Sequence, residues 1–261
     1  MTRPSPASTP VATSKTAALA RVLDLVPKGY TFHVSGQCPA GKALKLARKF
    51  HARYGIGCSP AQRLLRKQRG LANAQLVLYW PSFEAPTAHT IGRGHEHLGD
   101  AAGDADSAAA AAPEMETQTT DDEVPAVAHG EALVEWLLLV TPGTGRVADE
   151  EALKSVTAMP RLTWLGYELI RHAVRGKTSW TWRRPKTAMR EWHALLSAQL
   201  ATHKTTAVAQ TLTILARQPG FSGIRSQTLT LFAFARQHGY RAELPVVFFV
   251  QKQAAGPRML V

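Results

Sequence analysis

Acidic residues are missing from the whole stretch between Val26 and Phe83. The same stretch carries ten basic residues: Lys28, Lys42, Lys45, Arg48, Lys49, Arg53, Arg63, Arg66, Lys67 and Arg69. Cations gathered in this way repel one another unless water or a polyanion lies against them. The absence of acids therefore argues against a surface of mixed charge and points to nucleic acid.

Cysteine is also scarce, with only Cys38 and Cys58 in the chain. Two thiols are too few for a disulfide scaffold or a four-thiolate zinc site, which favours a cytoplasmic protein with reduced thiols. A zinc site made of Cys38, Cys58 and two histidines is the alternative, although the histidines do not follow at zinc-finger spacing. We therefore predict no metal and no cofactor.

Long hydrophobic runs are absent as well. No window approaches eighteen uncharged apolar residues, so we expect no membrane span and no membrane partner. The first residues, MTRPSPASTPVATSKT, lack the apolar core of a secretory signal. Residues 1–14 are predicted to be a disordered lead.

The acids that the chain does have are concentrated in one segment. Residues 84–131 hold eleven acids and a single base, Arg93, and their sequence is alanine-rich and of low complexity. Such a segment cannot bury enough apolar surface to order itself, so we predict a disordered acidic linker or loop. Residues 15–83 and 132–261 are then expected to form one basic domain, which is more cationic than the overall net charge of +12 indicates.

Hydrophobic periodicity and turn signals predict alternating helices and strands. Helices are expected at 15–25, 39–54, 59–71, 149–156, 185–202, 205–217 and 223–238. Strands are expected at 30–35, 74–80, 133–141 and 245–251, and a hairpin at 162–172 and 179–183. This mixture predicts an α+β fold, ferredoxin-like or a related mixed sheet, with helices on one face, a basic helical insertion and the disordered acidic loop.

The basic helical insertion, residues 39–71, is the leading candidate site. In its first helix Leu46, Phe50 and Tyr54 make an apolar stripe, and the lysines lie on another face. Nucleic-acid contacts are predicted for Lys42, Lys45, Arg48, Lys49, Arg53, Arg63, Arg66, Lys67 and Arg69. A solvated surface is the alternative, but the missing acids favour phosphate binding. The spacing is also compatible with a helix-turn-helix.

A second basic cluster interleaves with aromatic residues. It comprises Arg171, Arg175, Lys177, Arg183, Arg184, Lys186 and Arg190, beside Trp164, Tyr167, Trp180, Trp182 and Trp192. Basic side chains beside exposed aromatics suit stacking on unpaired bases, but for any single tryptophan burial in the core is the better interpretation. We predict phosphate contacts for Arg175, Lys177, Arg183 and Arg184.

One further phosphate contact is predicted at a helix start. Ser222 and Gly223 precede the helix expected at 223–238, and Arg225 falls in its first turn, where backbone N–H groups can receive a phosphate. A tight turn with a surface arginine is the alternative.

Three residues are candidates for catalysis. Cutting RNA without a metal needs a base, an acid and cations around the phosphate. His33, His51 and Tyr54 could fill these roles beside a nearby arginine, although each histidine alone is more often structural.

The layout resembles the repeat-associated RNA-binding proteins of CRISPR systems, in particular the small crRNA-processing endoribonucleases of plasmid-borne type IV systems. The resemblance lies in the strand at 30–35, the basic helices at 39–71, the strand at 74–80 and the helix–strand unit at 223–251. It implies a ferredoxin-like fold, binding of a repeat stem-loop, metal-independent cleavage in antiviral defence, and partner subunits in a ribonucleoprotein complex.

The leading hypothesis is therefore a protein that binds structured RNA and cleaves it in crRNA maturation. The alternative is a non-enzymatic DNA-binding accessory or replication protein of a plasmid or other mobile element. In that case 59–71 would be the groove-reading helix and 161–183 a wing-like hairpin. A third hypothesis is an interaction adaptor whose acidic loop covers its own basic surface.

Overall fold

The computed structural model describes residues 8–83, 132–174, 177–249 and 257–260. The acidic segment 84–131 lies outside these ranges, so its predicted disorder stays a prediction.

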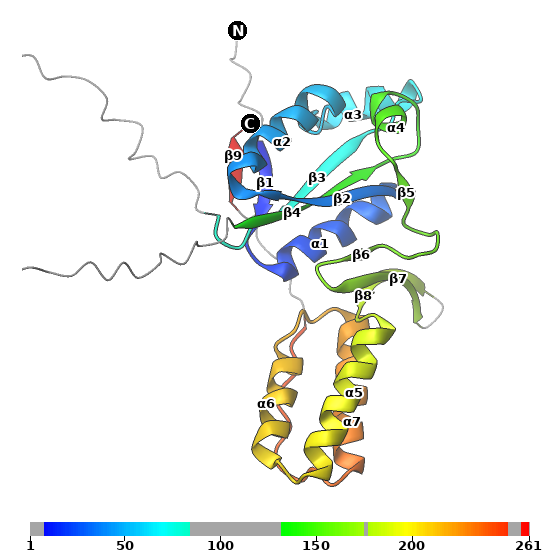
Figure 1. The fold of residues 1–261 in the computed structure, drawn as a ribbon. Coiled ribbons are helices and arrows are strands. Elements are labelled where there is room, and N and C mark those ends of the chain that lie inside the picture. The colour runs from blue at the N-terminus through cyan, green and yellow to red at the C-terminus, as the bar shows by residue number, and fades with distance from the viewer. Residues whose placement is uncertain (1–7, 84–131, 175–176, 250–256, 261) are drawn as a thin grey trace, which may run out of the picture. The chain divides into compact units, whose positions relative to one another are not determined.

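A six-stranded mixed sheet organises the first half of the fold (Figure 1), with strand order β5-β2-β4-β3-β1-β9. Its strands are β1 (Ser8–Ala12), β2 (Phe32–Pro39), β3 (Ala74–Tyr79), β4 (Leu133–Val140), β5 (Lys154–Ser155) and β9 (Arg258–Leu260). β1 runs parallel to β3, whereas the other neighbouring strands are antiparallel. The predicted α+β class and the mixed sheet are therefore confirmed.

Helices cover both faces of this sheet, so the prediction of helices on one face is wrong. α1 (Lys15–Leu25) packs with Leu137 and Leu139 of β4 in one core cluster. α2 (Ala40–Tyr54) packs with Leu138 and Val140 of β4 in a second cluster. Consecutive strand residues point to opposite faces, so these two clusters lie on opposite sides of the sheet. The order of elements also differs from the β-α-β-β-α-β order of a ferredoxin-like unit.

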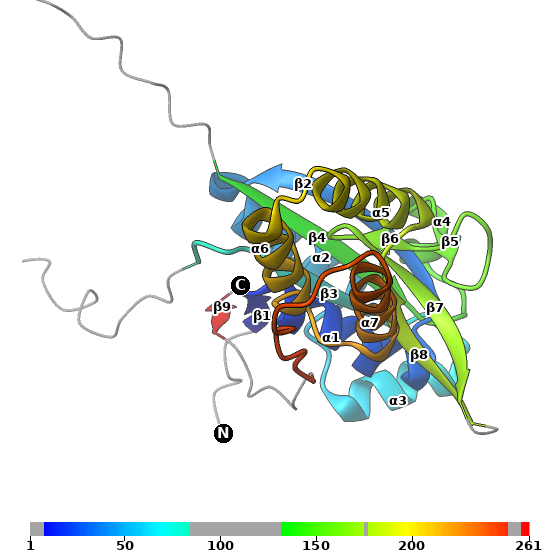
Figure 2. The ribbon, with the colours of Figure 1, turned by 90° about the horizontal axis from the view of Figure 1, so that it is seen from below.

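A three-stranded sheet and a three-helix cluster follow. The small sheet consists of β6 (Thr163–Trp164), β7 (Tyr167–Val174) and β8 (Lys177–Arg183), and the hairpin of β7 and β8 is as predicted. Helices α5 (Lys186–Ala201), α6 (Thr205–Ala216) and α7 (Ser222–Gln237) lie side by side around a core that includes Leu196, Leu212 and Leu231 (Figure 2). β8 connects α1 with α7. Trp182 Nε1 of β8 donates to the Leu19 carbonyl of α1 at 3.0 Å, and Ser222 Oγ of α7 donates to Thr181 Oγ1 of β8 at 2.9 Å.

Three local predictions are wrong, each because pairing or packing far along the chain decides the structure. Within the lead 1–14, residues 8–12 form β1, since they pair with β3 and with β9 at the other end of the chain. Instead of a helix at 149–156, α4 (Arg146–Glu150) ends early and β5 pairs with β2. Residues 245–249 form no strand, because Leu244 and Val247 pack against the three-helix core.

Candidate nucleic-acid interface

Helix α2 separates an apolar side from a cationic side. Its buried residues are Ala43, Ala47, Phe50 and Tyr54, which pack on the sheet. At 100° per residue these four positions cluster on one side of the helix, and the basic residues fall on the other side. The helix ends at Gly55, whose φ of 66° suits a left-handed cap. Local sequence alone therefore turns the lysines away from the sheet.

The cationic side carries four exposed bases, which we call the α2 basic face: Lys42, Lys45, Arg48 and Lys49. Among the described residues, none of the four has an acidic side chain within 4.0 Å. Arg53 on the same helix differs, because its Nη1 lies 3.1 Å from Glu150 Oε2. Arg53 is therefore already neutralised within the chain, and the α2 basic face is available to an outside anion.

Helix α3 (Pro60–Gln68) begins with a capping box between Ser59 and Gln62 and buries none of its residues. Two of its predicted phosphate contacts are used within the chain. Arg66 Nη2 donates to the Ala72 carbonyl at 2.8 Å. Arg63 Nη2 and Nε donate to the Gln75 amide oxygen at 2.7 and 3.1 Å when that amide is oriented with its oxygen toward Arg63. Lys67 and Arg69, also predicted contacts, are exposed.

The second basic cluster is divided by the structure. Arg184 is 2% exposed, and its guanidinium donates to Gln218, to the Ile224 carbonyl and to Thr228, so it is a core residue and not a phosphate contact. Arg183 is half-buried, with Nε 2.7 Å from Glu168 Oε2. Arg175 and the side chain of Lys177 lie outside the described residues.

The tryptophans of this cluster follow the core alternative. Trp164 and Trp182 are buried, and Trp180 is half-buried with the Arg171 guanidinium carbon 5.6 Å from its ring centroid. Fully buried rings cannot stack on bases. The interpretation of these tryptophans as core residues therefore holds for Trp164 and Trp182.

The loop before α7 is closed by the chain itself. The Gly223 N–H donates to Thr181 Oγ1 at 3.2 Å, and a Cβ on Gly220 would lie 2.2 Å from the Phe248 carbonyl oxygen. The Arg225 guanidinium carbon lies 3.4 Å from the Phe249 ring centroid. The phosphate site predicted around Arg225 is thus occupied by protein groups, as in its alternative of a tight turn.

The three catalytic candidates are not brought together. Phe32 and Val34 of β2 pack on the α2 side of the sheet, so His33 between them points to the α1 side, away from His51 and Tyr54. His33 is buried, and neither of its ring nitrogens has a hydrogen-bond partner among the residues that the structure describes. Burial, with Lys154 nearby, lowers the pKa of His33 to about 4, far below the pH at which it could act as an efficient base.

Tyr54 has a structural role in this arrangement. Its hydroxyl contacts Glu151 Oε1 at 2.5 Å and Glu150 Oε2 at 3.1 Å. Burial and these two carboxylates raise the pKa of Tyr54 well above its ordinary value. The hydroxyl ties α2 to the C-terminal end of α4 and cannot readily supply a phenolate.

Other site types find no support in the described ranges. They contain no group of three or more His, Cys, Asp and Glu side chains placed to hold a metal ion. No helix within them has the length and apolar character needed to cross a bilayer.

No protein-family model, curated protein or solved structure matches this chain. The resemblance to crRNA-processing proteins stays a prediction.

Two cations in the second cluster, Lys186 and Arg190, were not among the predicted contact residues, although both are exposed in the first turns of α5. The sequence did hold a signal for them, since the first turn of that helix contains no acid.

Proposed function

We propose that this protein binds nucleic acid, with structured RNA as its leading ligand, through the α2 basic face. The observation that carries the proposal is the set of four exposed cations on one side of α2, with no acidic partner among the described residues. A polyanion that binds to these cations offsets their mutual repulsion. The release of counterions from the nucleic acid adds to the affinity.

The spacing of the face suits a chain of phosphates. Seven residues separate Lys42 from Lys49, which corresponds to about 10 Å along a helix that rises 1.5 Å per residue. When the helix lies along a duplex, one strand advances roughly 3.4 Å along the duplex axis per nucleotide, so this length spans about three nucleotide steps. Contacts of this type fix a strand in position without reading its bases.

Duplex DNA is a second candidate, favoured by the exposure of α3. This helix buries no residue and exposes Gln62, Lys67 and Gln68. A B-DNA major groove admits an α-helix, and glutamine side chains can read adenine there. In this case α3 would read bases while the α2 basic face holds the backbone.

Equilibrium binding to three ligands of one length separates these candidates: an RNA stem-loop, an RNA whose sequence cannot form the stem, and a DNA duplex with the sequence of the stem. Structured RNA as ligand predicts tightest binding to the stem-loop at about 150 mM salt. Tightest binding to the duplex, lost when Gln68 is replaced with Ala, would support the second candidate. No binding to any of them would refute the proposal.

Cleavage is best tested separately from binding, because His33 lies on the other side of the sheet from His51 and Tyr54. We expect the all-ribo stem-loop to stay intact in EDTA. Uniform fragments that disappear with a 2′-deoxy group at the cut site, and with His33→Ala or His51→Ala, would instead restore metal-independent cleavage.

A further inference from the structure

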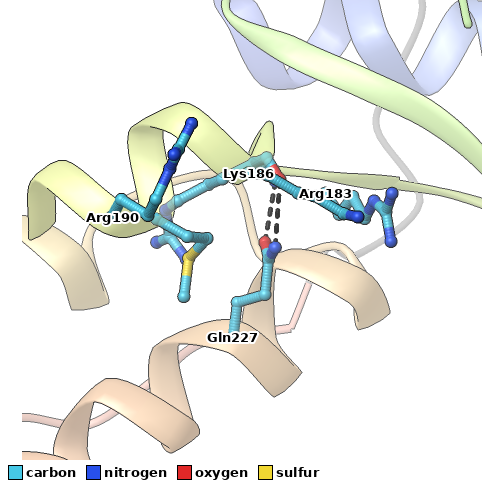
Figure 3. Close-up of a pocket in the computed structure, with 6 residues that line it drawn as sticks. Arg183, Lys186, Arg190 and Gln227 are labelled. Carbon is cyan, nitrogen blue, oxygen red and sulfur yellow. Dashed lines mark hydrogen bonds between the residues drawn. The ribbon is translucent and has the colours of Figure 1, made fainter. Parts of the chain in front are cut away.

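A pocket of about 460 Å³ lies where β8 ends and α5 begins, against α7 (Figure 3). We call it the α5 pocket. Its lining residues are Arg183, Arg184, Lys186, Met189, Arg190 and Gln227. It shares no residue with the α2 basic face.

The α5 pocket has a strong excess of positive charge. Four of its six lining residues are basic and none is acidic. Glu168 pairs with Arg183, but Lys186 and Arg190 have no acidic side chain within 4.0 Å among the described residues. α5 also begins without an acid in its first turn and without a side-chain cap, so the positive end of its dipole adds to the charge.

The wall of the pocket is held in place before any ligand binds. The Arg184 backbone N–H donates to Gln227 Oε1 at 2.7 Å, and Gln227 Nε2 donates to the Arg184 carbonyl at 3.0 Å (Figure 3). The buried Arg184 guanidinium fixes the same strand end to α7 through the Ile224 carbonyl and Thr228. A preformed wall lowers the ordering cost of binding.

The cations do not converge on one point. In Figure 3 the Arg183 and Arg190 side chains point away from each other, on different sides of Gln227. A clamp on a single small anion would turn its donors inward. Divergent cations beside the apolar Met189 suit a ligand that carries several phosphates joined by less polar groups, as a sugar–phosphate backbone does.

We propose that the α5 pocket is a second phosphate-contact site, which takes the backbone of a nucleic-acid strand. The class of ligand rests on the proposed function, but the residues are different, so the two can fail separately. Lys186 and Arg190 would contact phosphates directly, while Arg184 and Gln227 hold the wall that positions them.

The test measures binding of a 20-nucleotide RNA to full-length protein at several salt concentrations. Lys186→Gln with Arg190→Gln is compared with a matched control, Arg217→Gln with Arg241→Gln, which removes two exposed bases elsewhere. We expect the α5 variant alone to lower the slope of log K against log salt by about 1.4, at roughly 0.7 per phosphate contact on a single strand.

Each other outcome is decisive. If the α5 variant binds as the control does while neutralising the α2 basic face weakens binding, this inference is overturned and the proposed function stands. If the wild type binds no RNA, both fail. If inorganic phosphate or adenosine monophosphate binds the pocket as tightly as the RNA does, the site takes a single phosphate and the polymer assignment is wrong. Unchanged melting temperatures show that the variants are folded.

Discussion

At the scale of the residue, burial decides what each charged side chain can do. Arg183 and Arg184 are adjacent in sequence, yet Arg184 is 2% exposed with its guanidinium hydrogen-bonded on several sides, whereas Arg183 makes a half-buried ion pair. A run of bases in a sequence does not show which of them face outward. This is why the predicted contacts at Arg63, Arg66 and Arg184 are used inside the chain.

Replacing Arg184 with Met should cost about 3 kcal/mol or more of unfolding free energy, because Gln218, Thr228 and the Ile224 carbonyl lose their donor. Arg184→Lys should rescue little, since an ammonium cannot reproduce the planar fork. Urea denaturation measures this. The control, Arg183→Gln, breaks a partly exposed pair and should cost at most about 1 kcal/mol. Equal costs for the two would contradict the core role of Arg184.

His33 should make the protein sensitive to acid. Burial lowers its pKa from 6.5 to about 4, so the unfolded chain takes up the proton first. The stability linked to His33 is therefore complete above about pH 6.5 and is lost as the pH falls toward 4. In His33→Leu this part of the loss, on the order of 2–3 kcal/mol, should disappear. Denaturation of both proteins at pH 7.5 and 4.5 tests this, and parallel losses would refute it.

At the scale of the element, a helix or strand can be predicted from sequence when a local pattern determines it, and not when pairing with a distant segment does. α1, α2, α5, α6 and α7 carry helical periodicity along their own length and lie within about two residues of their predicted bounds. β1, β5 and β9 are short, and their pairing partners lie far along the chain, so no local pattern marks them. The α2 basic face was predictable because one helix determines it. The α5 pocket was not, because three elements build it.

At the start of α5, Lys186 should lower the stability of the protein while it strengthens RNA binding. Lys186 lies beside the positive end of the helix dipole, with no acid in the first turn. Lys186→Glu should therefore raise the unfolding free energy by about 0.3–1 kcal/mol while weakening RNA binding. Arg217→Glu, at the C-terminal end of α6, should lower the unfolding free energy instead. A loss of stability in Lys186→Glu would show that Lys186 does not interact unfavourably with the helix dipole.

At the scale of the whole molecule, charge is divided between parts of the chain. Residues 1–83 and 132–261 have net charges of +12 and +10, against −10 for residues 84–131. Both proposed contact surfaces belong to the basic parts. Acids tethered to the same chain lower the local potential felt by an approaching polyanion, and salt screens this effect.

Replacing residues 86–128 with a short Gly/Ser linker removes a net charge of −8 and should strengthen nonspecific RNA binding at low salt. The melting temperature should change little, since the free energy of loop closure depends weakly on length. A full-length control in which the acids of 86–128 become Asn or Gln should reproduce the gain. A gain that depends on shortening and not on charge would refute the electrostatic explanation.

The salt dependence of RNA binding tests the central claim most directly. The α2 variant replaces Lys42, Lys45, Arg48 and Lys49 with Gln. Its control replaces four exposed bases elsewhere, Lys15, Lys204, Arg217 and Arg241. If the α2 basic face holds phosphates, the slope of log K against log salt should fall by about 3 in the α2 variant, at roughly 0.7 to 0.9 per contact, and change little in the control. Equal slopes for wild type and a folded α2 variant would contradict the account.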